Sequence, residues 1–196
     1  MKTLNIATVV AALVLGQAAY AGTITYVADL LGTSEVPPNA SPGTGEATVI
    51  IDTLAQTMEV QVQFSGLLGI TTASHIHCCT AIPDTGNAGV ATTLPYFAGF
   101  PIGVTSGTYD QTLDLTLSSS YNPAFVTASG GSVANAEAAL LAGIAAGDSY
   151  LNIHSTVVPA GEIRGYLAEV PEPATFLMAG VALAGIAILR RKRALG

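Results

Sequence analysis

Met58-Glu59-Val60-Gln61-Val62-Gln63-Phe64 is the stretch that decides the fold, because apolar and polar residues alternate strictly along it. Successive side chains of a strand point to opposite faces, so this period of two predicts a strand with one buried and one solvated face. Such strands are typical of antiparallel sheets. Residues 46–51 form a second strand candidate, and the turn-like residues 52–56 join the two into a hairpin.

Further strand candidates on both sides of this hairpin favour an all-β domain. Residues near 135–146 are rich in alanine and leucine and predict one short helix, which Ser132 or Asn135 can cap. The composition therefore predicts an antiparallel β-sandwich or a barrel-like sheet with one helix. The additional strand candidates are short and lie at 23–30, at 90–93, once or twice within 104–117, and in a closing hairpin of 150–156 and 162–167.

The central part of the chain is strongly acidic. Residues 22–171 contain twelve acidic residues and one basic residue, Arg164, so this part carries a net charge of −11 against −7 for the whole chain. A nucleic-acid-binding protein needs a cationic surface to contact phosphates, so nucleic acid is excluded as a partner. Divalent cations and cationic polymers suit such a surface better.

The N-terminal residues have the three parts of a secretory signal peptide. Lys2 supplies the positive charge, residues 6–15 are apolar, and Ala19-Tyr20-Ala21 is a small-x-small cleavage site. We predict that signal peptidase removes residues 1–21 by cleaving between Ala21 and Gly22. The protein is therefore predicted to be exported.

The C-terminal residues 170–196 read as a membrane anchor. An uncharged apolar run at 174–189 precedes a basic tail, and its 16 residues would span about 24 Å as a helix, slightly less than the bilayer core of about 30 Å. Long basic side chains at the cytoplasmic end can cover the difference. The positive-inside rule then places residues 22–169 outside the inner membrane. The basic tail consists of Arg190, Arg191, Lys192 and Arg193.

The three histidines are the main candidates for chemistry. His75 and His77 share one face of a predicted strand, and Asn152 and His154 share a face of another. If these strands are neighbours, three imidazoles converge, and neutral imidazole is a ligand for copper and zinc. Two other interpretations are a purely structural hydrogen-bonded network, which we favour at this point, and general-base catalysis. A polar cluster of Glu35, Glu162 and Arg164 is expected beside them, with Arg164 in an ion pair.

Cys78 and Cys79 are adjacent and follow the histidine strand directly. In an exported protein they can form a vicinal disulfide, pair between chains, or act as thiolate ligands. Of these we favour the vicinal disulfide. Neighbouring cysteines cannot connect distant strands, so no disulfide framework is expected.

Four motifs in order resemble the chordin-type, or CHRD, domain. The resemblance covers about residues 24–168 and implies an all-β extracellular domain whose central strand carries the histidines. Two features depart from the family pattern: the Cys78-Cys79 pair, and Tyr166 where glutamine is common. The motifs are Glu35-Val36-Pro37-Pro38, His75-Ile76-His77, Tyr150-Leu151-Asn152-Ile153-His154, and Gly161-Glu162-Ile163-Arg164-Gly165.

The C-terminal segment resembles the PEP-CTERM sorting signal of Gram-negative bacteria. Pro171-Glu172-Pro173 stands directly before the apolar run and the basic tail, as in that signal. The resemblance implies transient anchoring in the inner membrane and processing by an exosortase near Pro171-Glu172-Pro173. It further implies release to the cell surface or to an exopolysaccharide matrix. A permanent anchor is the alternative.

No catalytic motif is present: the sequence contains no nucleophile elbow, phosphate-binding loop or zinc-protease helix. This absence does not exclude an activity. The targeting segments and the CHRD resemblance favour, as our main interpretation, a non-enzymatic surface or matrix protein with a binding or adhesive role. The alternative is an extracellular copper- or zinc-binding protein that uses His75, His77 and His154 and that can be redox-active.

Overall fold

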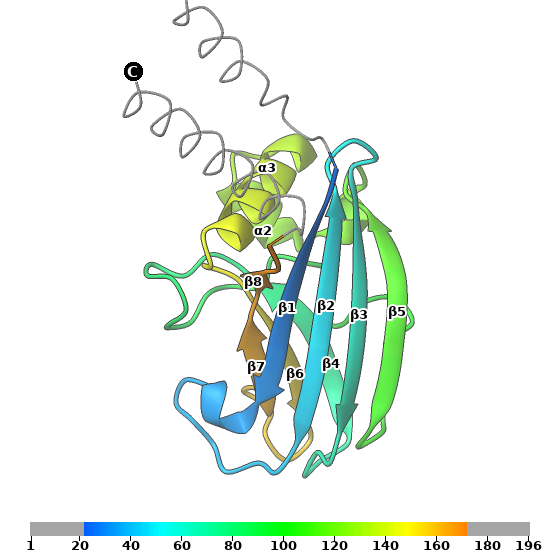
Figure 1. The fold of residues 1–196 in the computed structure, drawn as a ribbon, viewed down its shortest axis with the longest axis vertical. Helices are drawn as coiled ribbons and strands as arrows, with labels where there is room; N and C mark the ends of the chain where they lie inside the picture. Colours follow the sequence, from blue (N-terminus) through cyan, green and yellow to red (C-terminus); the bar gives the residue numbers. More distant parts are fainter. Residues whose placement is uncertain (1–21, 172–196) are drawn as a thin grey trace, which may run out of the picture.

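The computed structural model describes residues 22–171, which form one curled antiparallel sheet of eight strands (Figure 1). The spatial order is β4-β6-β7-β1-β2-β3-β5, and β8 pairs with β1 outside this path. The predicted all-β fold class is confirmed. The strands are β1 (Thr23–Leu31), β2 (Thr44–Asp52), β3 (Thr57–Ser65), β4 (Thr71–His77), β5 (Gly107–Asp114), β6 (Tyr150–Ser155), β7 (Ile163–Tyr166) and β8 (Ala168–Glu169).

The β2–β3 hairpin follows the alternation along residues 58–64. All four apolar side chains of β3 are buried, none more than 3% exposed, and pack in the core with the alternate residues of β1 and β2. Asp52 closes the turn because its carboxylate accepts hydrogen bonds from the backbone N–H groups of Leu54 and Ala55. The predicted hairpin is confirmed, and its register is uninterrupted from Thr44↔Ser65 to Asp52↔Thr57.

Two helices lie at the end of the sheet where β1 begins (Figure 1). The predicted helix is present as α3 (Val133–Ala145), and the Ser132 side chain caps it by accepting from the N–H of Asn135. A second helix, α2 (Pro123–Ala128), was not expected from the sequence. The strand expected at 90–93 is absent from the described residues, where this segment makes only isolated bridges. Short 3₁₀ turns are η1 (Gly32–Ser34) and η2 (Ser118–Ser120).

The histidine strand β4 lies at the edge of the sheet, so its expected central position was wrong. The long connection between β4 and β5 covers this edge. It contributes backbone hydrogen bonds from Phe97 N–H to the Ser74 carbonyl and from Thr71 N–H to the Val104 carbonyl. The free edge of β4 is therefore shielded by its own loop.

Strands β4, β6 and β7 use both of their faces. Ile76, Leu151 and Ile163 point into the apolar core and are fully buried. The alternate residues lie on the opposite, outer face. Leu30 of β1 points into the core, so its neighbour Leu31 points outward, and Arg164 pairs directly with Leu31 and shares its face. The outer row across the three strands is His75, Asn152 and Arg164.

The predicted signal peptide, residues 1–21, lies outside the described residues. The predicted membrane-spanning run, 174–189, and the basic tail also lie outside them. Within residues 22–171, no helix has both the length and the apolar character needed to cross a bilayer.

Candidate metal centre

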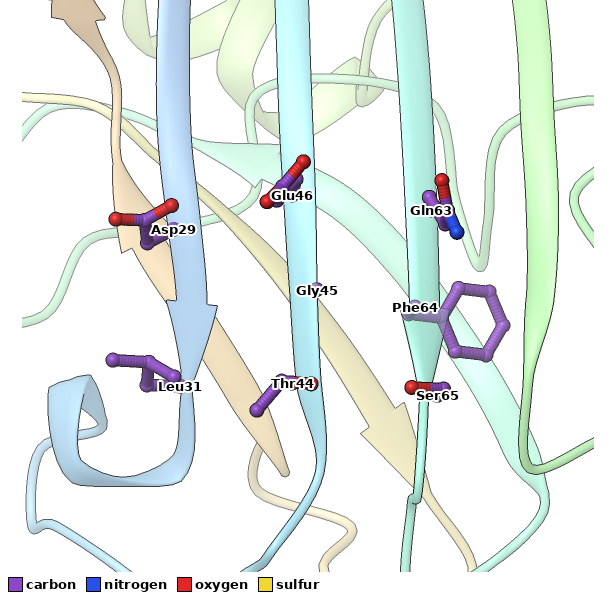
Figure 2. Close-up of a pocket in the computed structure, with 8 residues that line it drawn as sticks. All are labelled: Asp29, Leu31, Thr44, Gly45, Glu46, Gln63, Phe64 and Ser65. Atoms are coloured by element: carbon purple, nitrogen blue, oxygen red, sulfur yellow. The ribbon is translucent and has the colours of Figure 1, made fainter.

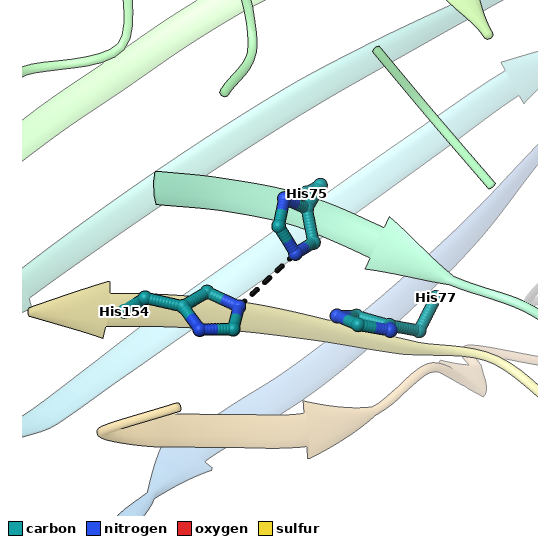
Figure 3. A group of neighbouring side chains, drawn as sticks. All are labelled: His75, His77 and His154. Atoms are coloured by element: carbon teal, nitrogen blue, oxygen red, sulfur yellow. Dashed lines mark hydrogen bonds between the residues drawn. The ribbon is translucent and has the colours of Figure 1, made fainter. Parts of the chain in front are cut away.

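The structure brings the three histidines together on the outer face of β4 and β6 (Figure 3). His75 and His77 come from β4, and His154 comes from β6, its antiparallel neighbour. One nitrogen from each ring lies within 4.8 Å of the others. His75 and His77 are buried, whereas His154 is partly exposed, so the cluster meets solvent at His154.

The hydrogen bonds of the rings fix which nitrogen faces the centre. A carbonyl oxygen can only accept, so each ring nitrogen that contacts one carries the hydrogen. The remaining nitrogen, Nε2, is therefore the one with a free lone pair in all three neutral rings. The Nδ1 donors reach the carbonyl of Pro95 at 3.2 Å from His75, of Ala88 at 2.8 Å from His77, and of Pro159 at 2.9 Å from His154.

These lone pairs face one another. Nε2 of His75 and Nε2 of His154 are 3.0 Å apart, and in this tautomer neither carries a hydrogen to donate. Nε2 of His77 is buried and has no hydrogen-bond partner among the described residues. Three inward lone pairs repel one another unless a proton or a cation lies between them. The arrangement is the one in which imidazoles ligate a metal, with the other nitrogen held by a backbone carbonyl.

A proton is disfavoured at this position. Burial lowers the pKa of His75 to about 3 and that of His77 to about 4, and it also lowers the pKa of His154. The neighbouring histidines lower the pKa of His75 further, because two imidazolium ions would repel each other. At neutral pH the rings are therefore neutral, which is the ligand form.

A buried cation lies one aromatic ring away from this cluster. The guanidinium of Arg164 is fully buried and lies 4.5 Å from the ring centroid of Tyr150. The Tyr150 ring stacks on His77, with centroids 4.6 Å apart and an interplanar angle of 9°. Arg164 contributes to the lowered pKa of His77, after burial and the charge of His154.

Glu35 is the ionic partner of Arg164. Its carboxylate lies 3.5 Å from Nε of Arg164, which also donates to the Ser34 carbonyl at 2.7 Å. Burial raises the pKa of Glu35 to about 7, against the opposing effects of Arg164 and Asn152. One oxygen of Glu35 and Nη2 of Arg164 have no hydrogen-bond partner among the described residues.

Loop residues form a cover over this polar face. Asn87 accepts a hydrogen bond from Nη1 of Arg164 at 2.8 Å and donates to the Val36 carbonyl, which ties two covering segments together. Tyr166 donates to the Gly86 carbonyl at 2.9 Å. This contact gives a role to the tyrosine that departs from the family pattern.

Glu162 lies apart from the Arg164–Glu35 pair. Its fully buried carboxylate accepts from Ser41 Oγ and from the backbone N–H groups of Leu68 and Gly69. Burial alone would raise the pKa of Glu162, but hydrogen bonds from Ser155, Ser41 and this backbone outweigh burial and lower the pKa. Glu162 therefore ties the β3–β4 connection to β7 and is not a neighbour of the imidazoles.

The sulfur atoms of Cys78 and Cys79 are bonded to each other and face helix α3. They pack at Gly143, where an added Cβ would overlap both sulfurs. Cys78 is buried and Cys79 is exposed. Neither cysteine belongs to the group of histidine nitrogens among the described residues.

A depression of about 330 Å³ lies elsewhere, over β1, β2 and β3 (Figure 2). Two carboxylates, from Asp29 and Glu46, sit on paired residues of β1 and β2. The histidines are not among its lining residues, and a pair of exposed acids is common on protein surfaces. This depression is therefore not the candidate site.

Several residues of the site had no recognisable signal in the sequence. The carbonyls of Ala88, Pro95 and Pro159 are backbone groups, and any residue type could supply them. Asn87 lies in a loop that sequence periodicity does not place. Tyr150 does carry a signal, because it shares the strand period with Asn152 and His154.

We predict that acidification destabilises the metal-free protein through His75 and His77. Their folded pKa values, near 3 and 4, lie below the ordinary value, so between about pH 4 and 6.5 only the unfolded chain binds these protons. Their contribution is complete above pH 6.5 and falls by about 2 kcal/mol per imidazole at pH 5. Glu35 acts in the opposite direction, because its raised pKa favours the folded state as the pH falls below about 7.

Urea unfolding of the metal-free full-length protein at pH 7 and pH 5 measures this effect. The loss of stability on acidification should be smaller in His75→Ala than in the wild type, and larger in Glu35→Gln. An equal loss in all three proteins would contradict the assignment of neutral buried imidazoles.

Comparisons with known proteins agree with the fold and with the terminal segment. A model of the CHRD domain matches residues 26–167, and a model of the PEP-CTERM protein-sorting motif matches residues 169–193. No curated protein and no solved structure matches the chain.

The curled sheet and the sorting motif together define an exported β-domain protein with a C-terminal anchor. The CHRD match covers more than half of the chain, and the chain belongs to the CHRD-domain family. Its terminal motif is a sorting signal of the kind that an exosortase processes.

Proposed function

We propose that this exported domain binds a transition-metal ion through Nε2 of His75, His77 and His154. The observation that carries the proposal is the convergence of three neutral Nε2 atoms, each on a ring whose Nδ1 is held by a backbone carbonyl. A structural network of histidines would pair donors with acceptors. Here acceptor faces acceptor at 3.0 Å, and a cation resolves the repulsion.

The donor set suits copper or zinc. Imidazole nitrogen is a ligand for both metals, whereas magnesium and calcium require oxygen ligands. Three protein ligands leave room for a further ligand, and the partly exposed His154 marks the side from which it would enter.

Metal analysis of the purified full-length protein tests the proposal. We expect one equivalent of copper or zinc per chain, with affinity at least 100-fold lower in His75→Ala and His154→Ala, because each variant loses one of three ligands. Thr72→Ala, an exposed change on the same strand, is the matched control and should retain the wild-type affinity. Absence of stoichiometric metal in the wild type, or equal affinity in all variants, would refute the site.

A second candidate role is adhesion or binding within an extracellular matrix. The sorting motif favours it, and so does the acidic surface, which suits cationic polymers.

In this proposal signal peptidase removes residues 1–21. Exosortase then cleaves near Pro171-Glu172-Pro173 and releases the domain from the inner membrane of a Gram-negative cell to its surface or exopolysaccharide. Mass spectrometry of the mature protein tests the processing step, and an intact Arg190–Arg193 tail would contradict it.

The matrix role has its own test. A deletion strain should show altered matrix retention or surface adhesion, and full-length protein carrying His75→Ala should restore the wild-type behaviour if the role does not depend on the histidines. Unchanged matrix and surface properties in the deletion strain would count against this role.

A further inference from the structure

The oxidation state of the bound ion follows from the charges around the three imidazoles. The described residues supply only neutral nitrogen ligands to the group, with no carboxylate or thiolate in it. A divalent ion would therefore keep its full charge of +2 in this site, and a monovalent ion its charge of +1.

Burial raises the desolvation free energy of a divalent ion more than that of a monovalent ion. His75 is 5% exposed and His77 is 9% exposed, so most of the ligand shell is withdrawn from water. The cost of desolvating an ion grows with the square of its charge, because it follows the Born relation. A site without anionic ligands in such surroundings therefore penalises a divalent ion much more than a monovalent one.

Arg164 adds a fixed positive charge beside the same ligands, in the outer row that also holds His75 and Asn152. Its guanidinium lies on Tyr150, and Tyr150 stacks in near-parallel contact on His77. Repulsion between two charges is weakly screened when the group between them is a buried ring and not water. Exposed acids such as Asp29 and Glu46 lie on the outer face of β1 and β2 and face solvent, where screening reduces their effect.

Glu35 compensates this charge only in part. A single Glu35 oxygen lies 3.5 Å from Nε of Arg164, and the other carboxylate oxygen makes no hydrogen bond among the described residues. Arg164 otherwise contacts neutral groups, the Ser34 carbonyl and the Asn87 amide oxygen. A buried cation therefore lies beside the ligand cluster, and its charge is only partly compensated.

We propose that the site selects monovalent copper over divalent zinc, and that Arg164 is the positioning residue that sets this selectivity through Tyr150 and His77. This inference rests on the metal-binding function proposed above. It adds the charge of the ion, and it assigns a function to a buried arginine that contacts no metal ligand directly.

The test measures two affinities for the same full-length protein in detergent. Cu(I) is titrated without oxygen against bicinchoninate, and Zn²⁺ is titrated against a chromophoric zinc chelator. We expect Cu(I) to bind at least 100-fold more tightly than Zn²⁺. Equal or tighter zinc binding that still depends on His75 would overturn the selectivity and leave the metal site standing, whereas no histidine-dependent binding of either ion would refute the site itself.

Charge variants with opposite signs separate electrostatic control from structural support. At pH 8.5, where Glu35 is ionised, Arg164→Gln should lower the ratio of Cu(I) to Zn²⁺ affinity about tenfold or more, and Glu35→Gln should raise it. Arg164→Lys keeps the charge and should retain most of the ratio. A purely structural role would weaken the binding of both ions equally, so an unchanged ratio in folded Arg164→Gln would overturn the proposal. If Arg164→Gln does not fold, an unchanged ratio in folded Glu35→Gln would overturn it.

Discussion

Replacing Glu162 with alanine is expected to lower the free energy of unfolding by roughly 3–5 kcal/mol. The Glu162 carboxylate is fully buried and accepts hydrogen bonds from the hydroxyls of Ser41 and Ser155 and from two backbone N–H groups. The substitution removes charge-assisted hydrogen bonds and leaves the N–H groups of Leu68 and Gly69 without their acceptor. Chemical denaturation of the full-length protein, followed by the near-ultraviolet circular dichroism of its tyrosines, measures the change.

Glu46→Ala is the matched control for this prediction. Glu46 is exposed on β2, so its removal should change the stability by no more than about 0.5 kcal/mol. Similar losses of unfolding free energy in the two variants would mean that the buried hydrogen bonds of Glu162 do not stabilise the fold.

Gly165→Ala should destabilise the protein by roughly 3 kcal/mol, near the upper end of the usual cost of overpacking. Strand β7 crosses so close to β1 that a Cβ on Gly165 would overlap the carbonyl oxygen of Asp29 and lie 2.9 Å from its carbonyl carbon. These are backbone atoms of a paired strand and cannot rotate away. The two strands would have to separate, which would disturb the Leu31↔Arg164 pair that holds β7 to β1.

Gly89→Ala tests whether this cost comes from the close approach or from the loss of a glycine in general. Gly89 has open space around it, with no atom within 4 Å of an added Cβ, and its backbone does not require glycine. It should be close to neutral. If thermal melts show the same shift for both variants, the close packing of β7 on β1 is not the cause.

The strands were predictable because burial imposes a period of two on the sequence. Met58, Val60, Val62 and Phe64 alternate with polar residues because one face of β3 meets the core and the other meets solvent. The helix at 133–145 was predictable from its composition and its serine cap. The short helix α2 was missed because six residues that begin with proline show too little periodicity to indicate one.

The order of the strands in the sheet could not be predicted from the sequence. Sequence periodicity identifies a strand, but it does not say which strands are its neighbours. The strand with His75 and His77 was expected at the centre and lies at the edge, because the connection after it returns to cover its free side. Its pairing with β6, on which the convergence of the histidines depends, was a stated condition of the sequence argument, and the structure has this pairing.

Glu162 and Arg164 belong to different hydrogen-bond networks, and their spacing in the sequence did not indicate this. Glu162 and Arg164 are two residues apart, and that spacing suggested one cluster. Arg164 lies within the four-residue strand β7, whereas Glu162 precedes the strand and turns toward Ser41 and Leu68. Glu35, distant in sequence, is the residue that reaches Arg164.

The partial exposure of His154 has a kinetic consequence. Its Nδ1 is held by the Pro159 carbonyl in the short connection between β6 and β7, whereas His75 and His77 are held by the long covering loop. Local motion of residues 156–160, which are exposed or partly exposed, is therefore enough to detach one ligand and admit a competing chelator. An ion should leave by releasing His154 first, so the exchange rate depends on this turn and not on global unfolding of the sheet.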